Sequence, residues 1–187
     1  MRWLVVAASL VCGCSFDRRG VTNTSVADAT VDATVDATVD ATVDAMVDAN
    51  PCPAGYAPIA GGEPKSQYRF IENGARWIDA EKDCEDDGLA HLAILDDDGE
   101  RNAVGAIAKG QPWLGVSDRV AEGTFMKVTT GLATYLPWLG GEPNDQFGED
   151  CVELKDGGFN DEDCDAANTY VCECDGLAAN PLSYTPP

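Results

Sequence analysis

Two segments of the chain have the hydrophobic spacing of amphipathic helices. In "NGARWIDAEKDCEDDG" (residues 73–88), Trp77, Ala80 and Cys84 recur at intervals that place them on one helical face. In "DDDGERNAVGAIAKG" (residues 96–110), acidic residues come first and a lysine comes near the end, as the helix dipole favours. A glycine closes each segment. The pattern predicts two helices, and it predicts that the aspartates opening the second segment form a helix cap and a solvated turn.

Five short apolar runs between turn residues predict β-strands. They read "HLAIL" at 91–95, "PWLGV" at 112–116, "TFMKV" at 124–128, "DCVEL" at 150–154 and "TYVCEC" at 169–174. Helices combined with many short strands and Gly-, Pro- and Asp-rich loops indicate one α+β domain over residues 52–175. Residues 176–187 have no hydrophobic period and predict a flexible C-terminal tail.

The first residues have the pattern of a targeting signal. The apolar run from Trp3 to Val11 follows Arg2 and is shorter than the roughly 20 residues that span a bilayer, so it suits a signal-peptide core. "VCGC", which ends at Cys14, resembles a bacterial lipobox, in which a small residue precedes the lipidated cysteine. We predict a lipoprotein signal peptide over residues 1–13 and a lipid anchor on Cys14. The protein would then lie in the cell envelope, at the bacterial outer membrane or cell surface; the alternative is an ordinary signal peptide and secretion.

A four-residue repeat follows the signal. "VADATVDATVDATVDATVDAMVDAN", residues 26–50, places an aspartate at every fourth position. Val, Thr and Asp are weak helix formers, and aspartates at i,i+4 would repel one another on a helix. A lone strand would have nothing to pair with. We predict that residues 14–51 are an extended acidic tether that holds the domain away from the membrane.

The composition excludes some partners and favours others. The 187 residues include 12 Lys and Arg against 33 Asp and Glu, a formal net charge of −21, which disfavours nucleic acid and favours cations. Eight cysteines indicate an oxidising compartment and disulfide bonds. If Cys12 leaves with the signal and Cys14 carries lipid, an even set remains that can pair in several ways. This set is Cys52, Cys84, Cys151, Cys164, Cys172 and Cys174.

An ordered series of motifs across residues 52–175 resembles the C-type lectin-like domain. The motifs are "WIDAEKDC", "WLGV", "EGTF", "WLGGEPND", "GEDCVEL", "FNDEDC" and "YVCE". Within that family, "EGTFMKVTTG" and "EPND…GEDC" look most like the mannose-binding proteins. The resemblance implies an α+β fold with two helices, two small antiparallel sheets and a long calcium-binding loop. It implies the disulfides Cys84–Cys172 and Cys151–Cys164, which leaves Cys52–Cys174 as the third pair.

The resemblance also implies a principal calcium site in the long loop. Calcium takes about six to eight oxygen ligands from carboxylates, amide carbonyls and backbone carbonyls, and this loop supplies all three. A cis peptide bond before Pro143 would turn the flanking side-chain oxygens towards one point. The implied ligands are the side chains of Glu142, Asn144, Glu149, Asn160 and Asp161, with the backbone carbonyl of Asp161.

A second, auxiliary calcium site is implied beside the first. Its ligands would be Asp118, Glu122, Asp145, Glu149 and Asp150. Together with Glu142 and Asp161, these carboxylates would repel one another strongly in the absence of cations. We therefore expect metal to order the loop.

The principal site implies carbohydrate binding by its five side chains. A calcium held by them keeps positions open for two vicinal hydroxyls, and the same Glu and Asn side chains can hydrogen-bond those hydroxyls. Glu142 followed by Asn144 resembles the mannose-type order, so the expected partners are glycans with mannose, glucose or N-acetylglucosamine-type sugars. The alternative is a calcium-stabilised adhesion or protein-interaction module that binds no sugar. The chain departs from the family in a loop before Glu149 that is one residue shorter, and in Phe159, which replaces the usual Trp.

Other chemistries fit the sequence poorly. Zinc prefers nitrogen and sulfur ligands, but the cysteines are assigned to bridges and the only histidine is His91, which we place at the surface or at a strand end. No segment has the spacing of an EF-hand. Without a histidine for a triad, a glycine-rich phosphate loop or a free cysteine nucleophile, the sequence predicts a binding protein and not an enzyme.

Overall fold

The computed structural model describes residues 52–187, so the predicted signal peptide, the lipid anchor on Cys14 and the whole acidic tether lie outside the described residues. The elements follow in the order β1 (Gln67–Ala75), α2 (Trp77–Glu85), β2 (Ala90–Leu92), α3 (Asp98–Ile107), β3 (Trp113–Ser117), β4 (Met126–Lys127), β5 (Cys151–Lys155), β6 (Gly158–Glu162), β7 (Asn168–Cys174) and a 3-10 helix (Pro181–Ser183). Within residues 52–187, no helix combines the length and the apolar character needed to cross a membrane.

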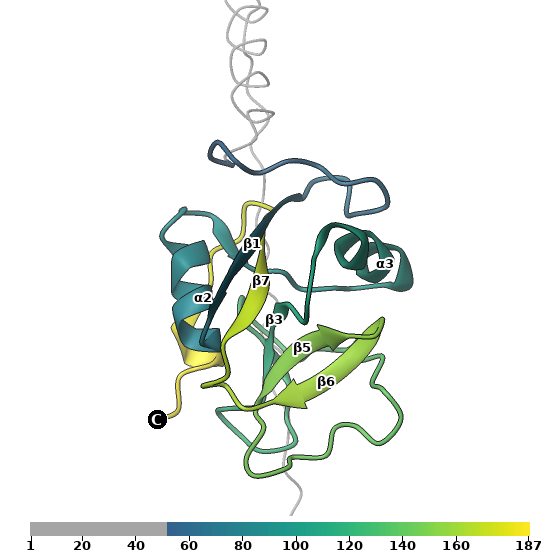
Figure 1. The fold of residues 1–187 in the computed structure, drawn as a ribbon. Coiled ribbons are helices and arrows are strands. Elements are labelled where there is room, and N and C mark those ends of the chain that lie inside the picture. Colours follow the sequence, from purple (N-terminus) through teal and green to yellow (C-terminus); the bar gives the residue numbers. More distant parts are fainter. Residues whose placement is uncertain (1–51) are drawn as a thin grey trace, which may run out of the picture. The chain divides into compact units, whose positions relative to one another are not determined.

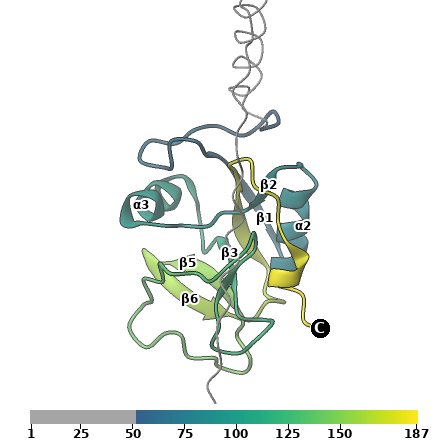
Figure 2. The same ribbon diagram turned by 180° about the vertical axis from the view of Figure 1, so that it is seen from behind.

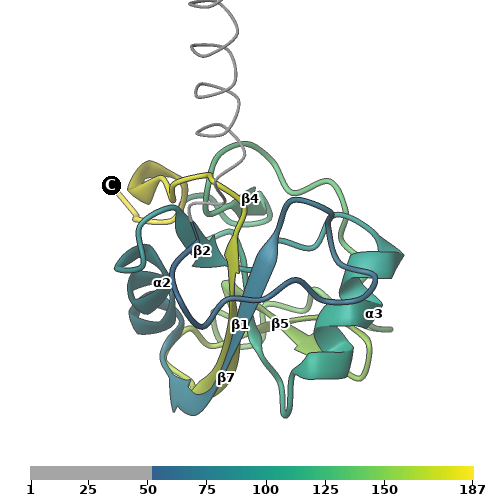
Figure 3. The same cartoon turned by 90° about the horizontal axis from the view of Figure 1, so that it is seen from above.

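The strands form one mixed sheet with two antiparallel parts (Figure 1). In one part β7 pairs with β1 and β2, and in the other β3 pairs with β4 and β5, and β5 pairs with β6. A single parallel pairing, Trp113 with Tyr170, joins the two parts. The two small sheets that the family resemblance implies are therefore continuous. The helices α2 and α3 lie on opposite sides of the β1–β7 pair (Figure 3).

Both predicted helices are confirmed, and their sequence signals explain them. The buried face of α2 contains Trp77, Ala80 and Cys84, as the spacing predicts. The predicted cap of α3 is Asp97, whose side chain accepts a hydrogen bond from the Glu100 backbone N–H at 2.9 Å. This contact satisfies one of the N–H groups that have no partner inside the helix.

Two strands, β1 and β6, were not predicted from the hydrophobic pattern. In β1, "QYRFIENGA", only Tyr68 is fully buried, and in β6, "GFNDE", the buried positions include Asn160 and Asp161. Backbone pairing to β7 and to β5 places these strands in the sheet. The apolar–polar alternation that marks a half-buried strand covers only the first four residues of β1, "QYRF", and is absent from β6.

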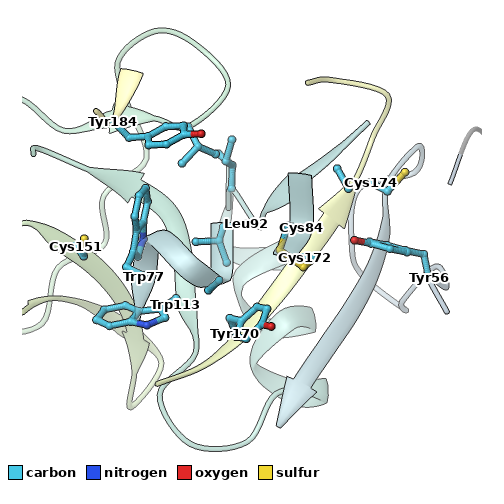
Figure 4. Close-up of a cluster of buried hydrophobic side chains, with 14 residues drawn as sticks. Tyr56, Trp77, Cys84, Leu92, Trp113, Cys151, Tyr170, Cys172, Cys174 and Tyr184 are labelled. Carbon is cyan, nitrogen blue, oxygen red and sulfur yellow. A yellow bond between two sulfur atoms is a disulfide. The ribbon is translucent and has the colours of Figure 1, made fainter. Parts of the chain in front are cut away.

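The core has one cluster on each side of the sheet. The first contains Trp77, Trp113 and Tyr170 beside the disulfides (Figure 4), and the second contains residues such as Leu114 and Phe159. Each buried tryptophan donates its indole N–H to a backbone carbonyl, so neither indole nitrogen is left without a partner. The bridges are Cys84–Cys172 and Cys151–Cys164, the pairs that the resemblance implies, and Cys52–Cys174, the pair that remained.

The C-terminal residues contradict the prediction of a flexible tail. Residues 181–183 form the 3-10 helix, and Tyr184 is only 4% exposed. Its ring meets the Trp77 ring edge-on at 5.6 Å, and its hydroxyl donates to the Glu85 carboxylate at 2.6 Å. Figure 2 shows this segment running beside β2 and α2. One aromatic residue in an aperiodic segment gives no pattern, although its ring has enough apolar surface to dock the segment.

His91 also departs from its predicted place, because it is fully buried in β2. Its Nε2 lies 3.3 Å from the Asp175 carboxylate, and Glu173 and Glu81 are close enough to interact with its charge. Burial alone would lower the pKa of His91, but the hydrogen bond to Asp175 and the charge of Glu173 outweigh it and raise this pKa to about 9. A buried imidazolium therefore balances buried carboxylates beneath the surface.

This network predicts a stability that falls as pH rises. The folded-state pKa of His91 lies above its unfolded value, so its contribution is complete below about pH 6.5 and is lost as pH rises through 9. Burial also raises the pKa values of Glu81 and Glu173 to about 7. These two groups therefore also make the stability fall as pH rises, but at lower pH than His91 does. We expect the unfolding free energy of the calcium-free protein in urea to drop by about 2 kcal/mol between pH 7 and 9.5.

The matched variant for this prediction is His91→Gln. It should be less stable at neutral pH, because it leaves the carboxylates of Glu173 and Asp175 without a cation, and its stability should change less between pH 7 and 9.5. An equally steep decline in wild type and variant would assign the pH dependence to other groups.

Candidate functional site

The base of the long loop is fixed to β6 by backbone pairing and by aromatic packing. The Leu139 N–H donates to the Phe159 carbonyl at 2.9 Å, and the Phe159 N–H donates to the Pro137 carbonyl at 2.9 Å. The half-buried Trp138 ring meets Phe125 at 4.8 Å and Phe159 at 6.1 Å, both edge-on. Phe159 is fully buried, so the ring that replaces the family's Trp still fills this position.

The acidic tip of the loop is held by one carboxylate from the sheet. Asp161, on β6 and 1% exposed, accepts the Asn144 N–H at 3.0 and 3.1 Å and the Asp145 N–H at 2.7 Å. The Asn144 side-chain amide in turn donates to the Glu142 carboxylate. The peptide bond between Glu142 and Pro143 is cis, as the resemblance implies. The structure therefore brings Glu142, Asn144 and Asp161 together.

Asn160 is oriented by a buried acid that the sequence analysis missed. Its amide nitrogen donates to the Glu153 carboxylate at 3.0 Å and to the Asp161 carbonyl at 2.8 Å. Both contacts use the nitrogen, which leaves the amide oxygen as the ligand atom that Asn160 can offer. Glu153 is fully buried on β5 and also accepts from Asn168 at 2.6 Å. Burial raises the pKa of Glu153 to about 7, with Lys155 opposing the shift. The signal was a lone acid inside the apolar run "CVEL".

Glu149 completes the first group of predicted ligands. Its carboxylate accepts the Gln146 N–H at 3.3 Å. Partial burial raises the pKa of Glu149, and the charges of Asp161 and Glu142 add to the shift. Glu149 is therefore close enough to Asp161 and Glu142 to feel their charges, and its one hydrogen bond is to the loop residue Gln146.

Three residues of the predicted auxiliary site form a second acidic cluster. Oxygens from Glu122, Asp145 and Asp150 lie within 4.8 Å of one another, and these residues come from two loops far apart in sequence. We call these three residues the acidic cluster. Glu149, predicted as a shared ligand, is not one of these three residues. Like charges held this close repel one another unless a cation lies between them.

Asp118 lies behind the acidic cluster and is 2% exposed. Its Oδ2 accepts the Gly123 N–H at 2.8 Å, which closes the turn that carries Glu122, while its Oδ1 is buried without a hydrogen-bond partner. Burial, followed by the charges of Glu122 and Asp150, raises the pKa of Asp118 to about 6. A buried oxygen without a donor fits a cation, which would supply the missing partner.

The donors in both groups fit calcium better than a transition metal. All are carboxylate or amide oxygens, which hard cations prefer, and no histidine or cysteine belongs to either group. In the described residues the cysteines are bridged and His91 is bonded within its own buried network. The arrangement can bind cations through carboxylate and amide oxygens that several segments bring together around one loop.

Phe147 is a second residue that the sequence analysis did not single out. It lies at the tip of the acidic loop, is 97% exposed and has a backbone φ of 68°, in the left-handed region that phenylalanine rarely adopts. Gly148 beside it also has a positive φ of 89°. The backbone therefore presents an aromatic ring to solvent within three residues of Asn144.

Comparison with known proteins identifies the family. The sequence pattern of the family described as "Lectin C-type domain" matches residues 73–174, more than half of the chain. The chain belongs to the C-type lectin domain family. The crystal structure of the cow CD23 C-type carbohydrate-recognition domain, determined in the presence of a GlcNAc2Man3 oligosaccharide, superposes with a TM-score of 0.60. That comparison has 30% identity and covers 70% of this chain and 99% of the cow domain.

The similar curated proteins are animal lectins. Human "C-type lectin domain family 17, member A" is 33% identical over 126 residues, which are 65% of this chain and 32% of the human protein. The "Alpha-N-acetylgalactosamine-specific lectin" of Patiria pectinifera is 29% identical over 121 residues, 57% of this chain and 72% of that protein. The chain thus spans about a third of the human relative. Membership of this family supports carbohydrate binding in general, and its members generally bind calcium.

The acidic cluster predicts a gain in stability when one of its charges is removed. Asp150→Asn should stabilise the calcium-free protein by about 0.5 kcal/mol, a small value because the group is largely solvated. The measurement is thermal unfolding after chelation, with an expected rise of about 2 °C in Tm. Glu72→Gln is the control, since Glu72 is an exposed acid paired with Lys109 at 3.5 Å, outside the acidic cluster. No difference between the two variants would contradict repulsion within the acidic cluster.

Proposed function

We propose that this chain is a calcium-dependent lectin that binds mannose-, glucose- or N-acetylglucosamine-type sugars through its long loop. The observation that carries the proposal is the convergence of Glu142, Asn144 and Asp161, with Asn160 and Glu149 beside them. These five side chains would hold the principal calcium ion. The acidic cluster, with Asp118 behind it, would hold a second ion that fixes the loop.

The bound calcium would supply coordination for two vicinal hydroxyls of the sugar. The residues of this chain would do the rest of the recognition. Carboxylate oxygens such as those of Glu142 can accept hydrogen bonds from hydroxyls, and the Asn144 amide can donate to them. Asn160 would contribute its amide oxygen to the calcium ion, because its amide nitrogen already donates to Glu153 and to the Asp161 carbonyl. Asp161 would act mainly as a fixed anchor, because its carboxylate already accepts two loop N–H groups. This is binding without a reaction, in keeping with the lectins among the relatives.

The preference for mannose-type sugars rests on the Glu142–Pro143–Asn144 order and on its resemblance to mannose-binding proteins. The cow neighbour was crystallised with an oligosaccharide of N-acetylglucosamine and mannose, whereas the Patiria relative is named for N-acetylgalactosamine. One of these names agrees with the expected mannose-type preference and the other does not. The proposed sugar preference therefore rests on the residues of the loop. A lipid anchor on Cys14 and the tether over 14–51 would place many copies on a cell surface, where clustering would add avidity to weak single sites.

A glycan array with and without chelator tests the proposal. We expect binding to mannose-type glycans in calcium and its loss after chelation. The matched variant Glu142→Gln with Asn144→Asp keeps the number of oxygen ligands and should shift preference towards galactose-type sugars by about tenfold or more. Calcium-dependent stability without any glycan signal would instead favour the alternative, an adhesion or protein-interaction module. An unchanged preference in the variant would show that the two residues do not contact sugar.

Phe147 gives a separate prediction about affinity. Its exposed ring can pack on the apolar face of a bound sugar, so Phe147→Ala should weaken glycan binding about threefold to tenfold. Calcium affinity, followed by isothermal titration, should not change, since the side chain offers no ligand oxygen. Leu89→Ala serves as the control, because Leu89 is an exposed apolar residue between α2 and β2. Equal effects of the two variants on glycan binding would rule out a role for Phe147.

A further inference from the structure

The C-terminal segment lies beyond the part of the chain that the family pattern matches, yet it is built into the domain. The match ends at residue 174, whereas Ser183 and Tyr184 are buried. The Asn180 N–H donates to the Val128 carbonyl at 2.8 Å, and the Asn180 side chain caps the 3-10 helix by accepting the Leu182 N–H at 3.2 Å. We call residues 176–185 the strap.

The strap contacts the turn that carries the ligands of the auxiliary site. Arg119, directly after Asp118, donates from Nη1 to the Tyr184 carbonyl at 3.0 Å. Its guanidinium lies over the Trp77 ring, 5.8 Å from the ring centroid. The Tyr184 ring packs on the same tryptophan, so Trp77 and the strap together fix the position of this cation.

Arg119 is also a neighbour of the acidic cluster. It lies in the turn that Asp118 closes, three residues before Glu122, yet it forms no ion pair with a carboxylate of the acidic cluster within 4.0 Å in the described residues. A guanidinium can pair with carboxylates in two-point geometry and is always charged. If it were released from Trp77, the Arg119 guanidinium could turn towards these acids and neutralise them in place of a metal ion.

We propose that the strap holds Arg119 against Trp77 and away from the acidic cluster, and that it thereby sets the affinity of this cluster for calcium. The inference rests on the proposed calcium site. Arg119 is a positioning residue, since it offers no oxygen to the ion. Its guanidinium suits the position because a flat fork can lie on an aromatic face while donating to a carbonyl at its edge.

Three variants separate positioning of the charge from simple support of the turn. Deleting residues 180–187 releases Arg119, and it should weaken calcium binding about tenfold. Arg119→Lys keeps the charge but loses the flat fork, so calcium binding should weaken about threefold to tenfold. Arg119→Gln also loses the guanidinium and its hydrogen bond to the Tyr184 carbonyl, but it leaves no positive charge near the acidic cluster. Its calcium affinity should therefore equal or exceed that of wild type. A purely structural role predicts weaker binding in all three variants.

The experiment combines calcium titration by calorimetry with NMR of the calcium-free protein. In full-length protein, the Arg119 side-chain protons should show ring-current shifts from Trp77, and these shifts should disappear in the deletion variant. Tyr184→Phe is the control, because it removes only the hydroxyl bond to Glu85 and should keep both the shifts and the calcium affinity. Arg119→Lys provides the test if the deletion variant does not fold, since it leaves the core intact.

A double-mutant cycle decides the outcome. Deletion should weaken calcium binding in the wild-type background and leave it unchanged in the Arg119→Gln background. Equal weakening in both backgrounds, unchanged affinity after deletion, or ring-current shifts that persist without the strap would each overturn the proposal while calcium binding itself stands. Absence of calcium binding by the full chain would instead overturn the proposed function, and the affinity role of the strap with it.

Discussion

The arrangement of the site depends on the carboxylate of Asp161. It is almost completely buried on β6, yet it accepts backbone N–H groups from two consecutive residues of a loop whose tip is exposed. A buried carboxylate needs such donors, because an ionised group away from water is costly unless it is hydrogen-bonded. The loop supplies these N–H donors, and the same hydrogen bonds fix the loop to β6. The positions of Asn144 and Asp145 follow from this one exchange, and Glu142 is connected to it through the Asn144 amide.

The long loop and the acidic cluster hold several carboxylates close together in a defined arrangement. Three cluster acids lie within 4.8 Å, Asp118 has a buried oxygen without a donor, and several carboxyl pKa values are raised. Such an arrangement costs stability in the absence of a cation and gains stability when one is bound. The disulfides and the two core clusters supply the stability that this loop does not, and Cys151–Cys164 lies directly beside the β5–β6 hairpin that carries the ligands.

The sequence predicts the parts of the fold whose signals are local. The buried face of α2 and the Asp97 cap of α3 can be recognised within a few residues of sequence. The disulfide pairs and the ligand set required the family resemblance, since many pairings fit the spacing alone. The features that the sequence did not predict have other causes. β6 follows β5 in a hairpin across Asp156 and Gly157, but its buried polar residues hide it from the hydrophobic pattern. β1 is placed by pairing to β7, about 100 positions away, and His91 and Tyr184 are buried by partners about 80 to 100 positions away in sequence. No local period reports such contacts.

The Cys52–Cys174 bridge has a mechanical consequence. It joins the start of the described chain to the end of β7, at the opposite end of the domain from the long loop (Figure 1). A load applied between residue 52 and a ligand held by the loop would therefore enter through a covalent bond into a strand paired on both sides. It would leave through β5 and β6, which Cys151–Cys164 closes. A disulfide therefore lies at each of the two points where force would enter and leave the domain, and these two bonds would resist unfolding under load.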